Sequence, residues 1–250
     1  MNLEAIIPIL IPASFLAGLV LERLVPAQPL PKVRGWVWKG TLFFIFTGIV
    51  NGIVPVVVAK VVGNRAPIDL SGWGTIAGGL AGFLVADFVG YWMHRLMHRV
   101  PFLWRWAHQM HHSAERMDVA GMAYNHPFDT VSVFFLTGLA TGLLGLSPTA
   151  GALAGLLGFY AALIQHSNVR TPRWLGYLVQ RPEAHGLHHE RGVHAYNYGS
   201  FPLWDILFGT FRNPTSFPGS YGFWNGASAK LGRMLVGRDV ATAPQGTSRV

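Results

Sequence analysis

The sequence predicts an all-α integral membrane protein. The expected bundle has about three spanning helices plus a hairpin of two shorter apolar helices, with a histidine-rich helical cap. Three observations predict this class. Hydrophobic residues fill 51% of the 250 positions and charged residues only 12%, whereas ordinary soluble domains carry about 25% charged residues. The apolar residues gather in runs of membrane-spanning length. All eleven histidines lie between residues 94 and 194, on the C-terminal side of the third apolar run.

Three apolar runs are expected to cross the membrane, at residues 3–21, 40–62 and 73–93. Each is close to the ~20 residues that a helix needs to cross ~30 Å of hydrocarbon. The third run repeats glycine at every fourth position, which favours close packing of one face against another helix, although glycine is common throughout the chain: Gly74, Gly78 and Gly82.

Two further apolar segments, at residues 131–144 and 149–165, are separated by a Gly-Leu-Ser-Pro sequence at 145–148. Both are short for a full crossing, so we expect a re-entrant or tilted hairpin. In either arrangement the chain returns to the side of the membrane that it left.

Basic residues predict which face is cytoplasmic. Four Lys/Arg residues separate the first two spans, two separate the second and third, and 13 of the 19 come at or after Arg95. With three crossings before His94 and a hairpin after it, the first loop and the histidine-rich segments share one face. That face carries most of the positive charge, so the histidine cap is predicted to be cytoplasmic.

The net charge of +8 does not indicate a nucleic-acid partner, because no dense basic block or nucleic-acid motif is present. The absence of cysteine excludes disulfides and thiolate metal sites. The N-terminus lacks the basic region of a cleaved signal peptide.

We expect N-terminal membrane helices in residues 1–70, a catalytic domain in 71–215, and a C-terminal surface helix and disordered tail in 216–250.

Eight of the histidines form three groups at helical spacing. Spacings of three or four residues let one helix offer two imidazoles to one site, and neutral imidazole binds Fe, Zn, Cu and Ni. Adjacent histidines point about 100° apart on a helix, which favours two different metal ions over one. The sequence therefore predicts a dinuclear site from the groups His94 and His98; His108, His111 and His112; and His185, His188 and His189.

Four other residues are candidates near this site. His126 and His166 are expected as further metal ligands, since both lie on the histidine-bearing side. His194 has either a contact to a ligand ring or a surface role. Asp87 comes two helical turns before His94 inside an apolar span, where a carboxylate needs a partner, and we expect it to hold a ligand imidazole.

The type of ligand favours redox-active iron. Zinc hydrolases often carry H-E-x-x-H and soluble di-iron bundles carry E-x-x-H, and neither motif is present. An all-imidazole dinuclear site at a membrane surface suits iron that activates dioxygen beside a lipid C–H bond, with water excluded by the apolar bundle.

The histidine pattern also resembles a known family. H-x-x-x-H at 94–98 and H-x-x-H-H at 108–112 and 185–189 resemble the fatty acid hydroxylase/sterol desaturase superfamily of membrane di-iron oxygenases. The segments around these histidines, over residues 83–212, are similar to the same family: "DFVGYWMHRLMH", "LWRWAHQMHHS", "NHPFD", "HSN" and "NYGSFPLWDILFGTF".

This resemblance implies a monooxygenase-type enzyme with two non-haem iron ions and dioxygen as co-substrate, which hydroxylates or desaturates a lipid such as a fatty acyl chain or sterol. It implies metal ligation by the eight grouped histidines, by His166, and by His126, the histidine of the family's H-P-x-E segment. Asp129 replaces the usual Glu there, which leaves its contact to a ligand open.

The resemblance also implies an external electron donor of the ferredoxin or cytochrome type. Arginines on the basic face could dock an acidic carrier or meet lipid phosphates. Two alternatives remain open: a histidine-rich metal transporter and a zinc-dependent lipid hydrolase. A transporter would place polar residues at mid-span, and residues 40–59 carry few.

Overall fold

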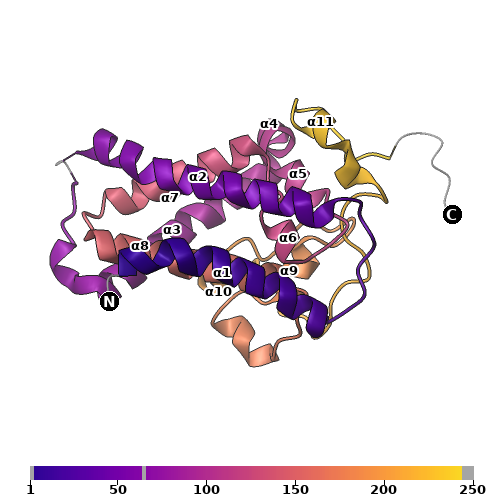
Figure 1. Cartoon of the computed structure of the whole chain (residues 1–250), viewed down its shortest axis with the longest axis horizontal. Helices are drawn as coiled ribbons and strands as arrows, with labels where there is room; N and C mark the ends of the chain where they lie inside the picture. The colour runs from indigo at the N-terminus through magenta and orange to yellow at the C-terminus, as the bar shows by residue number, and fades with distance from the viewer. Residues whose placement is uncertain (1–2, 64–65, 244–250) are drawn as a thin grey trace.

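The computed structural model describes residues 3–63 and 66–243. Figure 1 shows long helices running along the longest axis of the molecule, with most of the short helices gathered at one end. Within the described residues the chain forms helices and loops, with one isolated antiparallel bridge between Glu190 and Tyr221. The predicted all-α membrane bundle is confirmed.

The bundle consists of five long helices: α1 (Leu3–Leu24), α2 (Trp36–Val62), α3 (Gly74–Arg99), α7 (Pro127–Gly142) and α8 (Pro148–His166). By length and composition, α1, α2, α3 with the turn before it, and α8 can each cross a membrane, one more than the three spans predicted.

Helix α8 has 19 residues, and its N-terminus is capped at the Gly-Leu-Ser-Pro turn. The Ser147 hydroxyl accepts the N–H of Ala150 at 3.3 Å, and Pro148 occupies the first helical position, where its missing N–H costs nothing.

The predicted glycine face of α3 packs against α8. A Cβ at Gly78 would lie 3.0 Å from the Ala150 side chain, and a Cβ at Gly82 would lie 2.7 Å from Leu146. Gly79, which the four-residue repeat does not include, meets Leu153 in the same way. Gly74 does not take part: it begins the helix with a φ of +72° and faces open space.

Short helices build the cap at the C-terminal ends of α3 and α8. A π-helical turn, η2 (Trp104–His108), ends at the first residue of the second histidine group, and such turns are frequent at functional sites. The element η1 (Ser71–Trp73) directly precedes α3, at the end of that helix away from the cap. The remaining short elements are α4 (Pro101–Leu103), α5 (Gln109–His112), α6 (Val119–Met122), η3 (Arg173–Tyr177), α9 (Pro182–His188), α10 (Pro202–Leu207), η4 (Ala227–Lys230) and α11 (Leu231–Met234).

The C-terminal segment packs on the cap through single buried residues. In α11 the Met234 side chain is fully buried in a core with Met110 and Tyr124, whereas Leu235 and Val236 just after it are exposed. Val240 is also buried, and its carbonyl accepts the indole N–H of Trp224 at 2.9 Å. Only the part of the predicted tail at 244–250 lies outside the described residues.

Candidate metal centre

Nine histidines converge in two adjacent groups. In each group, nitrogen atoms that could bind one metal ion all lie within 4.8 Å of one another. The five-histidine group consists of His94, His98, His108, His112 and His188, and the four-histidine group of His111, His166, His185 and His189. These are all the predicted ligands except His126.

The adjacent histidines separate as their helical angle predicts. His112 belongs to the five-histidine group and His111 to the four-histidine group, and His188 and His189 divide in the same way. The rings of His112 and His189 stack at 4.1 Å between centroids, so the two groups are in direct contact. The last turn of α5 and the C-terminal end of α9 each provide histidines to both groups.

Inside each group the ring nitrogens approach one another closely. The Nε2 atoms of His108 and His112 are 3.0 Å apart, and those of His112 and His188 are 3.1 Å apart. In the four-histidine group, His166 Nε2 lies 3.1 Å from the Nε2 atoms of both His111 and His185.

Several buried nitrogens lack a hydrogen-bond partner within the described part of the chain, including Nε2 of His94, Nε2 of His98 and both nitrogens of His189. Unpaired buried polar atoms are costly. Converging imidazole lone pairs are the donors that a transition-metal cation takes, so the residues fit a metal ion in each group.

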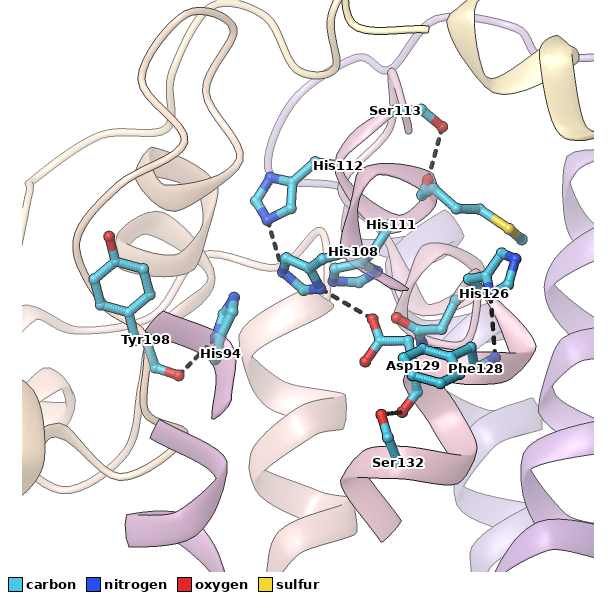
Figure 2. A network of polar contacts seen from close by, with 12 residues as sticks. His94, His108, His111, His112, Ser113, His126, Phe128, Asp129, Ser132 and Tyr198 are labelled. Atoms are coloured by element: carbon cyan, nitrogen blue, oxygen red, sulfur yellow. Dashed lines mark hydrogen bonds and ion pairs between the residues drawn. The ribbon is translucent and has the colours of Figure 1, made fainter. Parts of the chain in front are cut away.

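Outer hydrogen bonds set the tautomer of the rings. The Nδ1–H of His94 donates to the Tyr198 carbonyl at 2.7 Å, as Figure 2 shows, and that of His188 donates to the Tyr196 carbonyl at 2.7 Å. His166 uses the Ala162 carbonyl of its own helix at 2.8 Å. Each bond leaves Nε2 directed into the group and fixes the ring, which is the usual arrangement around a protein-bound metal.

Asp129 supplies the same kind of bond from a side chain. Its Oδ2 accepts from His108 Nδ1 at 3.0 Å (Figure 2). Asp129 is in the first turn of α7 and buried, and it thus contacts a histidine of the five-histidine group.

Burial keeps the cap histidines neutral. It lowers the pKa of each well below the usual value of about 6.5, and the neighbouring histidines lower it further because like charges repel. At neutral pH these rings therefore offer a lone pair rather than a proton: His108, His111, His112, His185, His188 and His189.

The remaining predicted residues lie outside both groups. His126 caps α7, where its Nδ1 accepts the N–H of Phe128 at 3.1 Å (Figure 2). His194 Nδ1 lies 3.0 Å from Nδ1 of His112, so it touches a group member from outside.

Asp87 differs from its prediction. Both of its oxygens accept backbone N–H groups, from Ser200 at 2.9 Å and Phe201 at 3.1 Å, in place of an imidazole. It thus holds the loop that carries the Tyr198 carbonyl, to which His94 donates.

The sequence reasoning missed this loop. His194, Tyr196 and Asn197 all have positive φ angles, of 42°, 67° and 47°, which non-glycine residues rarely adopt. Asn197 holds the conformation: its Nδ2 donates to the Ala184 carbonyl at 2.7 Å and its Oδ1 accepts from Arg212 N at 2.8 Å. The signal in the sequence that could have predicted a turn here is the motif "YNYG" at 196–199, because asparagine and glycine tolerate positive φ.

A cavity of about 500 Å³ connects the histidines with the bundle. Members of both groups border it, and the rest of its wall comes mainly from α2, α3, α7 and α8. Along α8 it extends from His166 to Gly151, which at 1.5 Å per residue is about 22 Å. Its volume is typical of a pocket for one small ligand.

Fold and site together define a membrane helical bundle with two adjoining histidine sites at the end of an apolar cavity. Comparison with known proteins then gives the family: the family model described as fatty acid hydroxylase matches residues 79–210. The chain belongs to the fatty acid hydroxylase family.

Curated relatives show moderate similarity. The chain is 34% identical over 138 residues to ornithine lipid hydroxylase OlsE of Rhizobium tropici, covering 53% of this chain and 41% of the relative. It is 31% identical over 140 residues to very-long-chain aldehyde decarbonylase GL1-9 of Oryza sativa subsp. japonica (52% and 53%). It is 28% identical over 133 residues to sphinganine C4-monooxygenase 1 of Arabidopsis thaliana (51% of each).

The matched region thus spans about half the length of these relatives. No solved structure matches the chain.

Proposed function

We propose that this protein is a membrane-bound non-haem di-iron oxidoreductase that uses dioxygen to hydroxylate or desaturate a lipid. One observation carries the proposal: two adjacent all-histidine groups border a single apolar cavity that runs into a bundle of membrane-length helices. The names of the relatives, which include lipid hydroxylases, support the same reaction class.

In this proposal each histidine group holds one iron ion. Bound iron would supply the reduction of dioxygen and the oxidation of a lipid C–H bond. The protein's own residues orient the ligands and exclude water. Carbonyls of the 194–198 loop and the Asp129 carboxylate hold the imidazole rings in place, and the buried cap excludes water from the reacting carbon.

The protein also needs electrons from outside the chain. We propose an external carrier of the ferredoxin or cytochrome type, docked on a cytoplasmic face that carries the histidine cap. Arg95, Arg99 and Arg105, which lie in and just after the first histidine group, and Arg116, which is ion-paired with Asp118, are the basic residues that we expect on this face, and positive charge suits an acidic carrier.

The test uses the full-length protein, purified with iron and supplied with reductant, labelled dioxygen and a lipid extract of the expression host. Mass spectrometry should find label incorporation, or new unsaturation, that the His111→Ala/His188→Ala double variant loses. An unlabelled hydrolysis product formed equally well without oxygen would instead indicate a lipid hydrolase. Full activity in the double variant would exclude the proposed centre.

A further inference from the structure

The wall of the cavity contains buried polar atoms that have no hydrogen-bond partner in the described part of the chain. Thr130 is 5% exposed and Gln165 is 7% exposed, and both line the cavity. The Thr130 hydroxyl and the Gln165 side-chain oxygen have no hydrogen-bond partner among the described residues. Buried polar groups are nearly always paired, so these two atoms call for an explanation.

Several other polar side chains in the same wall are paired. The hydroxyls of Thr137 and Thr141 donate to carbonyls of their own helix. Asp87 accepts two backbone N–H groups, and Asp129 accepts from His108. Among the described residues that line this cavity, the buried side-chain oxygens without a partner therefore belong to Thr130, Gln165 and Thr47.

Both residues lie beside the histidines. Gln165 directly precedes His166 at the end of α8, and Thr130 directly follows Asp129 at the start of α7. Helices α7 and α8 both pack against α3. A third hydroxyl without a partner among the described residues, that of Thr47, belongs to α2. It lies 11 residues after Trp36, which begins that helix at the cap, so it is about 16 Å along α2 from Trp36.

A plain hydrocarbon chain at the histidine end would leave both atoms unsatisfied. The Gln165 oxygen accepts a hydrogen bond, and the Thr130 hydroxyl both donates and accepts. A site with buried hydrogen-bonding groups rejects ligands that lack the matching group. The ligand that matches carries a donor such as an amide N–H or a hydroxyl.

We propose that Thr130 and Gln165 form a polar subsite, and that the lipid acted on carries an amide or hydroxyl group close to the carbon that is oxidised. This proposal rests on the proposed function, because it assumes that the reacting carbon lies beside the histidines. It narrows the substrate class from apolar chains in general to lipids oxidised near a hydrogen-bonding group.

The experiment compares two probes of equal chain length, hexadecanamide and methyl hexadecanoate, of which only the amide has a donor. Their dissociation constants are measured by calorimetry on the iron-loaded full chain in detergent micelles. Wild type should bind the amide about tenfold more tightly, the factor expected from one or two hydrogen bonds. In the Thr130→Val/Gln165→Met variant this ratio should fall to within about twofold, with binding of the ester retained.

Thr137→Val is the matched control, because this hydroxyl lines the same cavity but is already paired within its helix; the ratio should not change. A wild-type ratio near one, or an unchanged ratio in the double variant, would overturn the proposal. Loss of the ratio in Thr47→Val alone would also overturn it by placing the polar group deeper. None of these results would remove oxygen-dependent product formation from the lipid extract, which tests the function itself.

Discussion

At the scale of single residues, the division of neighbouring histidines is the central feature. His111 and His112 are consecutive, yet each belongs to a different group. The groups are unequal: one offers five imidazoles and the other four. Removal of one ring should therefore have different consequences in the two groups.

The first prediction compares His185→Ala with His98→Ala. His185→Ala leaves three histidines in its group, whereas His98→Ala leaves four. After dialysis against a chelator, elemental analysis should find about one iron ion per chain in His185→Ala and closer to two in His98→Ala, because fewer ligands hold the ion less tightly. Equal iron retention in the two variants would contradict this grouping.

The second prediction concerns Asp129, whose carboxylate orients His108. Asp129→Ala should weaken iron binding or activity about 10- to 100-fold, the usual effect of losing a partner of a metal-binding histidine. Asp129→Asn keeps an oxygen acceptor and should lose less. Chelator competition measures both variants, and identical losses would show that the hydrogen bond itself is not what matters.

The third prediction is a pH dependence of the metal-free protein. Burial holds the pKa of the cap histidines well below the value of about 6.5 that they have in an unfolded chain. The unfolded state then binds more protons, so the stability of the metal-free fold should fall as the pH drops below about 6.5 and level off above it. Thermal unfolding in detergent between pH 5 and 8 tests this, and a transition temperature that rises on acidification would refute it.

At the scale of elements, close helix contacts fix how the cap meets the bundle. Helix α2 touches the short helix α6, which lies between the second histidine group and His126. Gly40 makes this contact, because a Cβ there would overlap the backbone carbonyl of Ala120. The Trp36 indole adds a 2.8 Å bond to Asp118, the N-cap of α6.

The fourth prediction follows from this contact. Gly40→Ala should destabilise the protein by about 1–3 kcal/mol, since backbone cannot move aside for the added methyl. Gly52→Ala in the same helix is the control: nothing lies within 4 Å of that position, and alanine should stabilise the helix by up to about 1 kcal/mol. Thermal stability in detergent should therefore change in opposite directions, and a neutral Gly40→Ala would disprove the close contact.

At the scale of the whole molecule, four long helices and the cap enclose one cavity that reaches the histidines. Gly155 lines it and has open space where a side chain would be. Its position, 11 residues before His166, is about 16 Å along α8. The cavity therefore has a shallow part beside the histidines and a deeper part beyond Gly155.

The fifth prediction is that Gly155→Phe closes the deep part. Activity on host lipids should shift toward shorter chains while the iron content stays at the wild-type level, because the histidines are untouched. Mass spectrometry of the products measures the shift. Gly52→Phe, which does not line the cavity, should leave the chain-length distribution unchanged. An unshifted distribution in Gly155→Phe would show that the substrate does not occupy this depth.

The sequence by itself determined the helices and the grouping of the histidines. Apolar run length predicted α1, α2 and α3, and the 100° step between adjacent helical residues predicted that His111 and His112 would separate. Both are local properties, set by residues a few positions apart. For the same reason the sequence could not show that Met234 of the last helix is buried, since nothing local records that burial.

Only the tertiary structure decided which hydrogen-bond partners orient the imidazole rings. His94 donates to the Tyr198 carbonyl 104 residues away, through a loop that Asp87 and Asn197 keep in place. His126 directly precedes Pro127 and caps the N-terminus of α7, whereas its position on the histidine-bearing side had predicted a metal ligand. A backbone carbonyl has no signature in the sequence, and its direction depends on how distant segments dock, so no spacing rule could have predicted these contacts.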